Sequence, residues 1–326
     1  MNPMIKIGFN QVLETVPQLF KNNLTPILWG NPGMGKSAAI KAVAEKYKLK
    51  LIDVRLSSCT PEDFTGLPFI KNGKSTYAPF DWIPTTSDTI PSGYNGWLLF
   101  LDELGLAKPS VQKPLYKLIY DREVNQEPVH PNLFIAAASN YPETGCLVEE
   151  LSYALKRRLV HLHVDLTFQE WSENLSSQIS TEVLGFLRWK PDMFYQFNDE
   201  IEYAYPNPSS WIQVSKFNNP SIHLLAGLIG DHCAYEFKAY LEVYNSLPSK
   251  EDILSGKADV PNKSSVKYAV MSWLPTWIDE SNHMQIIRYM SKFPVEMQAF
   301  ALKDATSRNP KCKTWEGVID WVMNIG

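Results

Sequence analysis

The chain contains the stretch Gly30-Asn31-Pro32-Gly33-Met34-Gly35-Lys36-Ser37. It matches G-x-x-x-x-G-K-[ST], the pattern of a loop that wraps around phosphate groups. The glycines allow a tight turn in which successive backbone N–H groups point inward at phosphate oxygens. The lysine brings a positive charge to the β- and γ-phosphates, and the serine hydroxyl can bind Mg²⁺. We therefore predict that a nucleotide is bound by Asn31, Pro32, Gly33, Met34, Gly35, Lys36, Ser37 and Ala38.

The residues on both sides of this loop agree with that prediction. Before the loop, residues 26–29 form a short apolar run that predicts a buried strand. After the loop, apolar side chains fall on one helical face at Ile40, Val43, Ala44 and Tyr47. A loop between a strand and a helix N-terminus is the setting in which backbone N–H groups bind anions. The alternative is a chance glycine-rich turn, but such a turn need not lie between a strand and a helix.

Length and composition limit the class of protein. A chain of 326 residues with 44% apolar content can bury a large core and predicts two domains. The net charge of −4 and the scattered Lys and Arg residues give no support for nucleic-acid binding. No signal peptide and no apolar run of roughly 18 residues is found, so we expect a soluble, cytoplasmic protein without a membrane span. The cysteines are widely spaced, which is typical of reduced thiols: Cys59, Cys146, Cys233 and Cys312.

The order of apolar and helical patterns predicts the architecture. Further apolar runs that predict strands lie at residues 50–56, 97–101, 133–138 and 159–164, and helical patterns lie at residues 110–120 and 151–158. This alternation predicts an α/β fold, a parallel sheet covered by helices on both faces. A hairpin is predicted around Asn72-Gly73, followed by a long loop over residues 79–96.

The strand signal ends near residue 166, and short helical patterns follow. We therefore expect a core domain over residues 1–165, a helical domain over residues 166–245 and a C-terminal helical extension over residues 246–326.

Asp102 and Glu103 directly follow the apolar run at residues 97–101. At the C-terminal end of a strand, Asp102 is placed to bind the Mg²⁺ that bridges the β- and γ-phosphates. Glu103 could orient and activate the attacking water. The alternative is an acidic pair on the surface at the end of a strand. The phosphate loop upstream in the same predicted sheet favours the catalytic interpretation.

Two further polar positions are candidates for the same site. Asn140 ends the strand at residues 133–138 and would face the γ-phosphate, although an Asn before Tyr141-Pro142 is also typical of a turn. Arg157 and Arg158 follow a helix, where a guanidinium can stabilise a transferring phosphoryl group in a neighbouring subunit. Taken alone, basic residues at a helix end more often offset the helix dipole.

The order of phosphate loop, strand with Asp-Glu, strand with Ser-Asn and helix with Arg-Arg resembles that of AAA+ ATPases. The details resemble the MoxR type in the helix-2-insert branch. Four stretches carry this closer resemblance. The first two are Gly66-Leu67-Pro68 before a hairpin and Tyr77-Ala78-Pro79 with Trp82. The other two are residues 111–115 through Asp121-Arg122-Glu123-Val124, and Ala154-Leu155-Lys156-Arg157-Arg158-Leu159-Val160.

The resemblance implies a ring-shaped homo-oligomer, a hexamer, with ATP and Mg²⁺ bound between subunits and a helical lid over residues 166–245. It implies a protein partner with a von Willebrand factor A domain, and Asn140 as sensor 1 and Arg158 as the arginine finger. One position departs from the family. Ser209, in Pro208-Ser209-Ser210-Trp211, stands where the lid usually carries a sensor 2 Arg, and Lys216 is a residue that could compensate.

Three other residues are candidates for roles near the site. Arg55 could pair with Glu103 when no substrate is engaged, although a plain Arg at the end of a strand is the more common case. His161 and His163 would share one face of a strand, but no other ligand cluster accompanies them. We therefore predict no metal site besides the nucleotide Mg²⁺.

The function predicted from the sequence is Mg²⁺-dependent ATP hydrolysis in a MoxR-like AAA+ ring, coupled to chaperone-like remodelling or activation of a protein partner. One alternative is a nucleotide-gated assembly switch with little turnover. A second is a DNA-acting AAA+ motor or loader, against which the acidic pI of about 5.9 counts.

Overall fold

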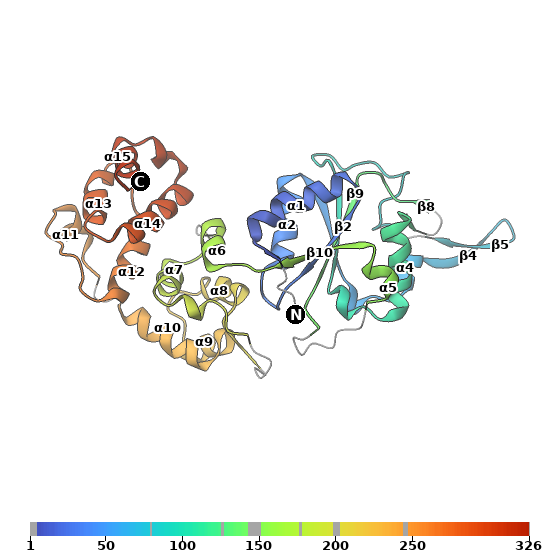
Figure 1. The fold of residues 1–326 in the computed structure, drawn as a ribbon, viewed down its shortest axis with the longest axis horizontal. Coiled ribbons are helices and arrows are strands. Elements are labelled where there is room, and N and C mark those ends of the chain that lie inside the picture. The colour runs from blue at the N-terminus through green and yellow to red at the C-terminus, as the bar shows by residue number, and fades with distance from the viewer. Residues whose placement is uncertain are drawn as a thin grey trace. The chain divides into compact units, whose positions relative to one another are not determined.

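The computed structural model describes residues 5–78, 80–124, 127–142, 151–175, 178–197, 203–243 and 247–325. The chain divides into two compact units, Met1–Leu166 and Thr167–Gly326. The first unit is built around a β-sheet and the second from helices (Figure 1). This arrangement confirms the predicted α/β core with a helical C-terminal region.

The first unit contains a central sheet of six parallel strands in the order β1-β10-β2-β9-β6-β3. Because the strands are parallel, the loops that follow β2, β6 and β9 all leave the same edge of the sheet. The elements of this unit are β1 (Lys6–Ile7), α1 (Phe9–Lys21), β2 (Thr25–Trp29), α2 (Lys36–Lys46), β3 (Leu49–Arg55), α3 (Glu62–Thr65), β4 (Leu67–Lys71), β5 (Lys74–Ala78), β6 (Gly96–Asp102), α4 (Pro109–Tyr120), β7 (Glu123–Val124), β8 (Glu127–Pro128), β9 (Leu133–Ser139), α5 (Tyr153–Lys156) and β10 (Leu159–Val164).

Helices cover both faces of the sheet, with α1 and α2 on one face and α4 and α5 on the other (Figure 1). Strand β6 shows why its sequence is apolar throughout. Leu98 and Phe100 belong to the core formed with α1 and α2, whereas Leu99 and Leu101 belong to the core formed with α4. Successive side chains of a strand point to opposite faces, so a strand buried on both faces has no polar alternation.

The structure contains the predicted hairpin, but it differs from the prediction in the length of one helix and in three short strands. The hairpin β4–β5 turns at Asn72 and Gly73, which have φ angles of 52° and 73°, and it projects from the unit (Figure 1). The helix expected over residues 151–158 is shorter and covers Tyr153–Lys156. Strands β1, β7 and β8 were not predicted, because two residues are too few to show a periodic pattern. Pro79, residues 125–126 and Cys146 lie outside the described residues.

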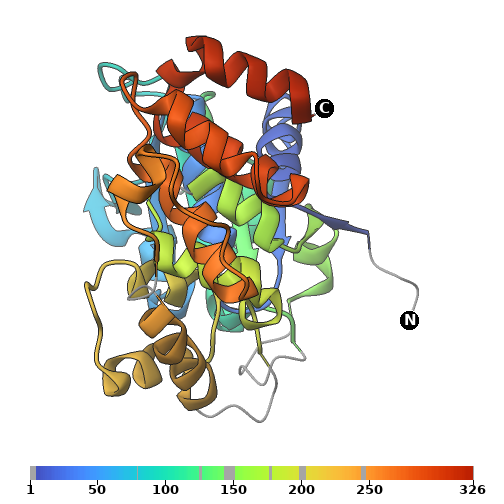
Figure 2. The same ribbon diagram turned by 90° about the vertical axis from the view of Figure 1, so that its left-hand side faces the viewer.

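The described residues of the second unit form helices joined by loops and contain no strand (Figure 2). Its helices are α6 (Phe168–Leu175), α7 (Thr181–Trp189), α8 (Pro208–Val214), α9 (Ile222–Ile229), α10 (Asp231–Val243), α11 (Lys250–Leu254), α12 (Ser264–Trp273), α13 (His283–Met290), α14 (Val295–Arg308) and α15 (Glu316–Ile325). The predicted division of this region into a lid and an extension near residue 245 stays a prediction.

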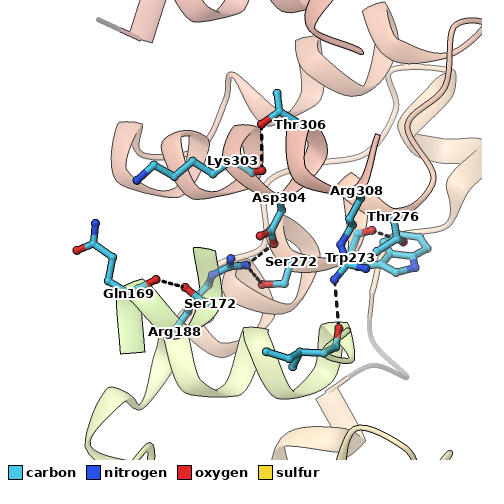
Figure 3. Close-up of polar contacts among 11 residues, drawn as sticks. Gln169, Ser172, Arg188, Ser272, Trp273, Thr276, Lys303, Asp304, Thr306 and Arg308 are labelled. Atoms are coloured by element: carbon cyan, nitrogen blue, oxygen red, sulfur yellow. Dashed lines mark hydrogen bonds and ion pairs between the residues drawn. The ribbon is translucent and has the colours of Figure 1, made fainter. Parts of the chain in front are cut away.

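A buried ion pair links helix α7 to helix α14 of this unit (Figure 3). The Arg188 guanidinium on α7 donates to the Asp304 carboxylate on α14 and to the Ser272 hydroxyl on α12, each at 2.9 Å. The side chains of Arg188 and Asp304 are 7% and 3% exposed. Removing one partner of such a pair leaves a buried charge, which typically costs about 3–5 kcal/mol of stability.

No helix in the described part of the chain is long and apolar enough to cross a membrane. Three of the four cysteines, Cys59, Cys233 and Cys312, are described and have free thiols.

Candidate nucleotide site

The loop at residues 30–37 has a backbone that depends on its glycines. Gly33 and Gly35 adopt φ angles of 76° and 77°, in the left-handed region that favours glycine. A Cβ at Gly30 would lie 2.9 Å from the carbonyl oxygen of Val164. The loop therefore needs a glycine at each of these three positions.

Helix α2 begins directly at the end of this loop. The Ala39 N–H donates to the Gly35 carbonyl at 2.9 Å and starts the helical hydrogen-bond pattern. The N–H groups of Lys36, Ser37 and Ala38 precede that bond and lie in the first turn of the helix. Together with the positive end of the helix dipole, these groups suit a phosphate.

Lys36 joins the loop to the end of strand β9. Its ammonium group donates to the carbonyls of Gly30 and Asn31 at 2.8 Å and 2.9 Å, and to the side-chain oxygen of Asn140 at 2.8 Å. The residue is 7% exposed. Lys36 and Asn140, which are 104 positions apart, are therefore in direct contact, as expected if both face the same phosphate.

Ser37 and Asp102 lie side by side at the same edge of the sheet. The Ser37 hydroxyl donates to Asp102 Oδ2 at 2.9 Å, and Asp102 Oδ1 accepts the Glu103 N–H at 2.9 Å. A hydroxyl and a carboxylate in contact are oxygen donors of the kind that Mg²⁺ prefers. This donor set fits the predicted metal role of both residues.

Glu103 has an unusual backbone. Its φ angle is 59° and its ψ angle is 37°, a left-handed conformation that is uncommon for a residue with a side chain. Such conformations cost about 1–3 kcal/mol and cluster at functional sites. The strain gives Glu103 a reason to be considered functional that the sequence pattern alone did not supply.

The partner of Glu103 differs from the one considered from the sequence. The Ser57 hydroxyl donates to the Glu103 carboxylate, and no ion pair joins Arg55 to Glu103 within the described residues. Arg55 is the exposed last residue of β3. The 3₁₀ turn Leu56–Ser58 after it packs against the turn Leu104–Leu106, and this brings Ser57 to Glu103 instead. Sequence analysis did not identify Ser57, because a serine after a strand carries no distinguishing signal.

Ser139 is a second residue with a role that the sequence did not assign. Its hydroxyl accepts the Gly105 N–H at 3.2 Å and donates to the Asn140 carbonyl at 3.0 Å. It is 2% exposed. Ser139 thereby links the turn that follows Glu103 to the segment that carries Asn140.

Arg157 and Arg158 lie far from this site within the chain. Leu159 pairs in register with Thr25, the first residue of β2, whereas the loop follows Trp29, the last residue of β2. At about 3.3 Å per residue, the four steps from Thr25 to Trp29 separate the two edges of the sheet by roughly 13 Å. The Arg158 side chain lies over the ring of Tyr120 on α4, with its guanidinium carbon 4.0 Å from the ring centroid.

His161 and His163 are hydrogen-bonded to the aromatic side chains of Trp29 and Tyr141. The Trp29 indole N–H donates to His161 Nδ1 at 2.9 Å, and the Tyr141 hydroxyl is hydrogen-bonded to His163 Nδ1 at 3.3 Å. Burial lowers the pKa of His163, and His161 lowers that pKa further. Throughout the residues that the structure describes, no three His, Cys, Asp or Glu side chains are grouped so that they could hold a metal ion.

Ser209 lies in helix α8 of the second unit and does not cap it. The N-cap is Asn207, whose side-chain oxygen accepts the Ser210 N–H at 3.0 Å while the Ser210 hydroxyl accepts the Asn207 N–H at 2.9 Å. Ser209 therefore cannot serve as the N-cap of this helix, because Asn207 already fills that position. Ser209 itself is exposed.

We predict that Ser209→Ala has only a small effect on ATP turnover and leaves the melting temperature unchanged. An uncharged, short side chain cannot replace the long reach of an Arg to the γ-phosphate. Turnover should stay within about threefold of the wild type, a difference under roughly 1 kcal/mol. Asn207→Ala is the matched comparison, since loss of the cap should cost about 1 kcal/mol and lower the melting temperature. A collapse of turnover in Ser209→Ala with an unchanged melting temperature would contradict this prediction.

Residues 26–159 match the family described as the AAA domain, dynein-related subfamily. This match supports an AAA+ P-loop ATPase core in the first unit. None of the curated proteins matches the chain.

Three solved structures are among those that match the chain at low similarity. An inferred ATPase from Cytophaga hutchinsonii is 11% identical, with a TM-score of 0.40, over 98% of this chain and 89% of that protein. NtrX from Brucella abortus in complex with ATP is 13% identical, with a TM-score of 0.38, over 96% of this chain and 69% of that protein. A RuvB mutant from Thermotoga maritima is 16% identical, with a TM-score of 0.36, over 98% and 89%. Sequence identities and TM-scores this low say nothing about the activity of the present chain.

Proposed function

We propose that this protein is a Mg²⁺-dependent ATPase that works as a MoxR-like AAA+ ring and remodels or activates a protein partner. The observation that carries the proposal is the convergence of three adjacent strand ends. Lys36 after β2 contacts Asn140 after β9, and Ser37 contacts Asp102 at the end of β6, next to Glu103. These residues would supply phosphate binding, metal binding and a candidate base at one edge of one sheet.

Each group at this edge has a distinct task in hydrolysis. The Lys36 ammonium and the N–H groups at the N-terminus of α2 would bind the phosphate oxygens. Ser37 and Asp102 would hold Mg²⁺, which neutralises charge on the β- and γ-phosphates. Glu103 would take a proton from the attacking water. Asn140, already hydrogen-bonded to Lys36, would orient the γ-phosphate or that water.

The ring is proposed from the position of Arg158. The residue lies at the sheet edge opposite Lys36, so it cannot complete the site of its own subunit. An arginine that stabilises a transferring phosphoryl group can instead come from a neighbouring subunit. We propose a hexamer with ATP between subunits, and a partner with a von Willebrand factor A domain, on the resemblance to the MoxR type.

Steady-state phosphate release from ATP in the presence of Mg²⁺ tests this function. The wild type should turn over, and Lys36→Ala should bind ATP about 100-fold more weakly, because hydrogen bonds to charged groups contribute about 1.5–3 kcal/mol. Lys41→Ala is a matched control on the same helix, since Lys41 is exposed and pairs with Asp53 on the surface at 3.3 Å. Its binding and turnover should equal those of the wild type.

A nucleotide-gated switch with little turnover is the second candidate. The hydrogen bond from Ser57 to the Glu103 carboxylate favours it, because this hydrogen bond must be broken before the same carboxylate oxygen can contact an attacking water. ATP binding that depends on Lys36, without phosphate release in the presence or absence of a partner, would support the switch and contradict hydrolysis. Turnover that rises strongly on addition of DNA would instead favour a DNA-acting motor.

A further inference from the structure

Two tyrosines on helix α4 form a platform under the side chain of Arg158. Tyr116 and Tyr120 are four residues apart, so they lie on one face of the helix, and their ring centroids are 5.7 Å apart. The guanidinium carbon of Arg158 is 4.0 Å from the centroid of Tyr120 and 6.0 Å from that of Tyr116. The arginine is therefore held by the faces of aromatic rings.

This contact does not serve to bury the arginine. Arg158 is exposed, and Tyr120 is 53% exposed. A ring that stacks on a guanidinium is attracted by its charge but does not use its N–H groups as hydrogen-bond donors. The five N–H donors at the edge of the guanidinium remain suited to a phosphate or carboxylate from another molecule.

The platform also restricts the motion of a long side chain. An unsupported arginine on a surface samples many rotamers, and all but a few must be given up when it binds. Rings that hold the guanidinium in one place remove part of that entropic cost before binding.

We propose that Tyr120, supported by Tyr116, is a positioning residue that holds Arg158 ready to enter the nucleotide site of the neighbouring subunit. The proposal rests on the proposed function, in which Arg158 acts across a subunit interface. Tyr120 itself touches no substrate in this scheme and acts only through Arg158.

The chain supplies an internal control for this inference. Arg157 lies over the ring of Tyr153, with its guanidinium carbon 5.4 Å from the ring centroid, and Tyr153 is 74% exposed. The same kind of contact is thus made by the adjacent arginine, which is not the proposed finger. If the platform matters only through Arg158, loss of Tyr153 should have no effect on turnover.

The test compares kcat, KM and ring assembly for Tyr120→Ala, Tyr120→Phe, Tyr120→Leu and Tyr153→Ala, with ATP and Mg²⁺. We expect kcat to fall about fivefold in Tyr120→Ala and Tyr120→Leu, with KM for ATP and assembly unchanged. Tyr120→Phe keeps the ring and should retain turnover within about twofold, as should Tyr153→Ala. In the Arg158→Ala background, Tyr120→Ala should cause no further loss.

Each other result overturns the proposal in a distinct way. Wild-type turnover in Tyr120→Ala, with a large loss in Arg158→Ala, would refute the platform and leave the proposed function standing. An equal loss from Tyr120→Ala in both backgrounds would show that Tyr120 acts independently of Arg158. A failure of Tyr120→Ala to assemble would make the tyrosine an interface residue. Full turnover in Arg158→Ala would refute both the platform and the proposed finger.

Discussion

Glu103→Gln is expected to bind ATP as the wild type does and to lose turnover by about 10²–10⁴-fold. A glutamine has nearly the shape of a glutamate, so the turn after β6 should be preserved. Its amide cannot accept a proton from the attacking water, and a positioned base typically contributes a factor of that size. Nucleotide affinity measured by titration and phosphate release measured at saturating ATP check the two halves of this prediction.

A matched control separates the loss of a base from the loss of a negative charge. Glu45→Gln makes the same chemical change at an exposed position on α2, away from the strand ends. It should keep wild-type affinity and turnover. Wild-type turnover in Glu103→Gln would contradict the assignment of Glu103 as the base and would leave its left-handed backbone without a catalytic explanation.

The order of the main elements of the first unit could be predicted because the central strands β2, β6 and β9 are buried on both faces. Continuous apolar runs such as residues 97–101 are rare outside such strands, and the polar residues that end them therefore mark one edge of the sheet. The contacts of Lys36 with Asn140 and of Ser37 with Asp102 agree with that placement.

The partners of these residues could not be predicted, because they depend on how turns pack. Ser57 reaches Glu103 only because the 3₁₀ turn after β3 lies against the turn after β6. Ser139 bridges the two neighbouring strand ends by a buried hydroxyl. A serine in a turn gives no signal of such a contact, since its neighbours in space are set by the whole sheet.

The second unit was the least predictable part of the chain. Arg188 and Asp304 are 116 positions apart and sit in helices that are ordinary in sequence, yet they form a nearly completely buried ion pair. Helical periodicity identifies a buried face but not the helix that covers it. For the same reason, the contact between Arg158 and Tyr120 emerged only from the structure.

Arg158→Ala is expected to lower turnover by about 10³–10⁵-fold while each subunit still binds ATP. The residue lies at the opposite end of β2 from the phosphate loop, so its loss should leave the loop of its own subunit intact. The guanidinium would act on the charge that develops on the phosphoryl group, and arginines in this role contribute a factor of that size. Arg157→Ala is the matched control, since the adjacent arginine should be dispensable for turnover.

Mixing Arg158→Ala subunits with Lys36→Ala subunits tests whether Arg158 acts across an interface. At an ATP concentration that saturates the wild type but lies well below the dissociation constant of Lys36→Ala, neither variant alone should turn over appreciably. A mixed ring pairs an intact loop from the Arg158→Ala subunit with an intact Arg158 from the Lys36→Ala subunit. In a heterologous ring assembled at random from equal amounts, about a quarter of the interfaces combine the two intact parts. Turnover should therefore recover to about a quarter of the wild-type value. If rings assemble from both variants and still show no turnover, Arg158 acts within its own subunit or stabilises the structure that follows α5.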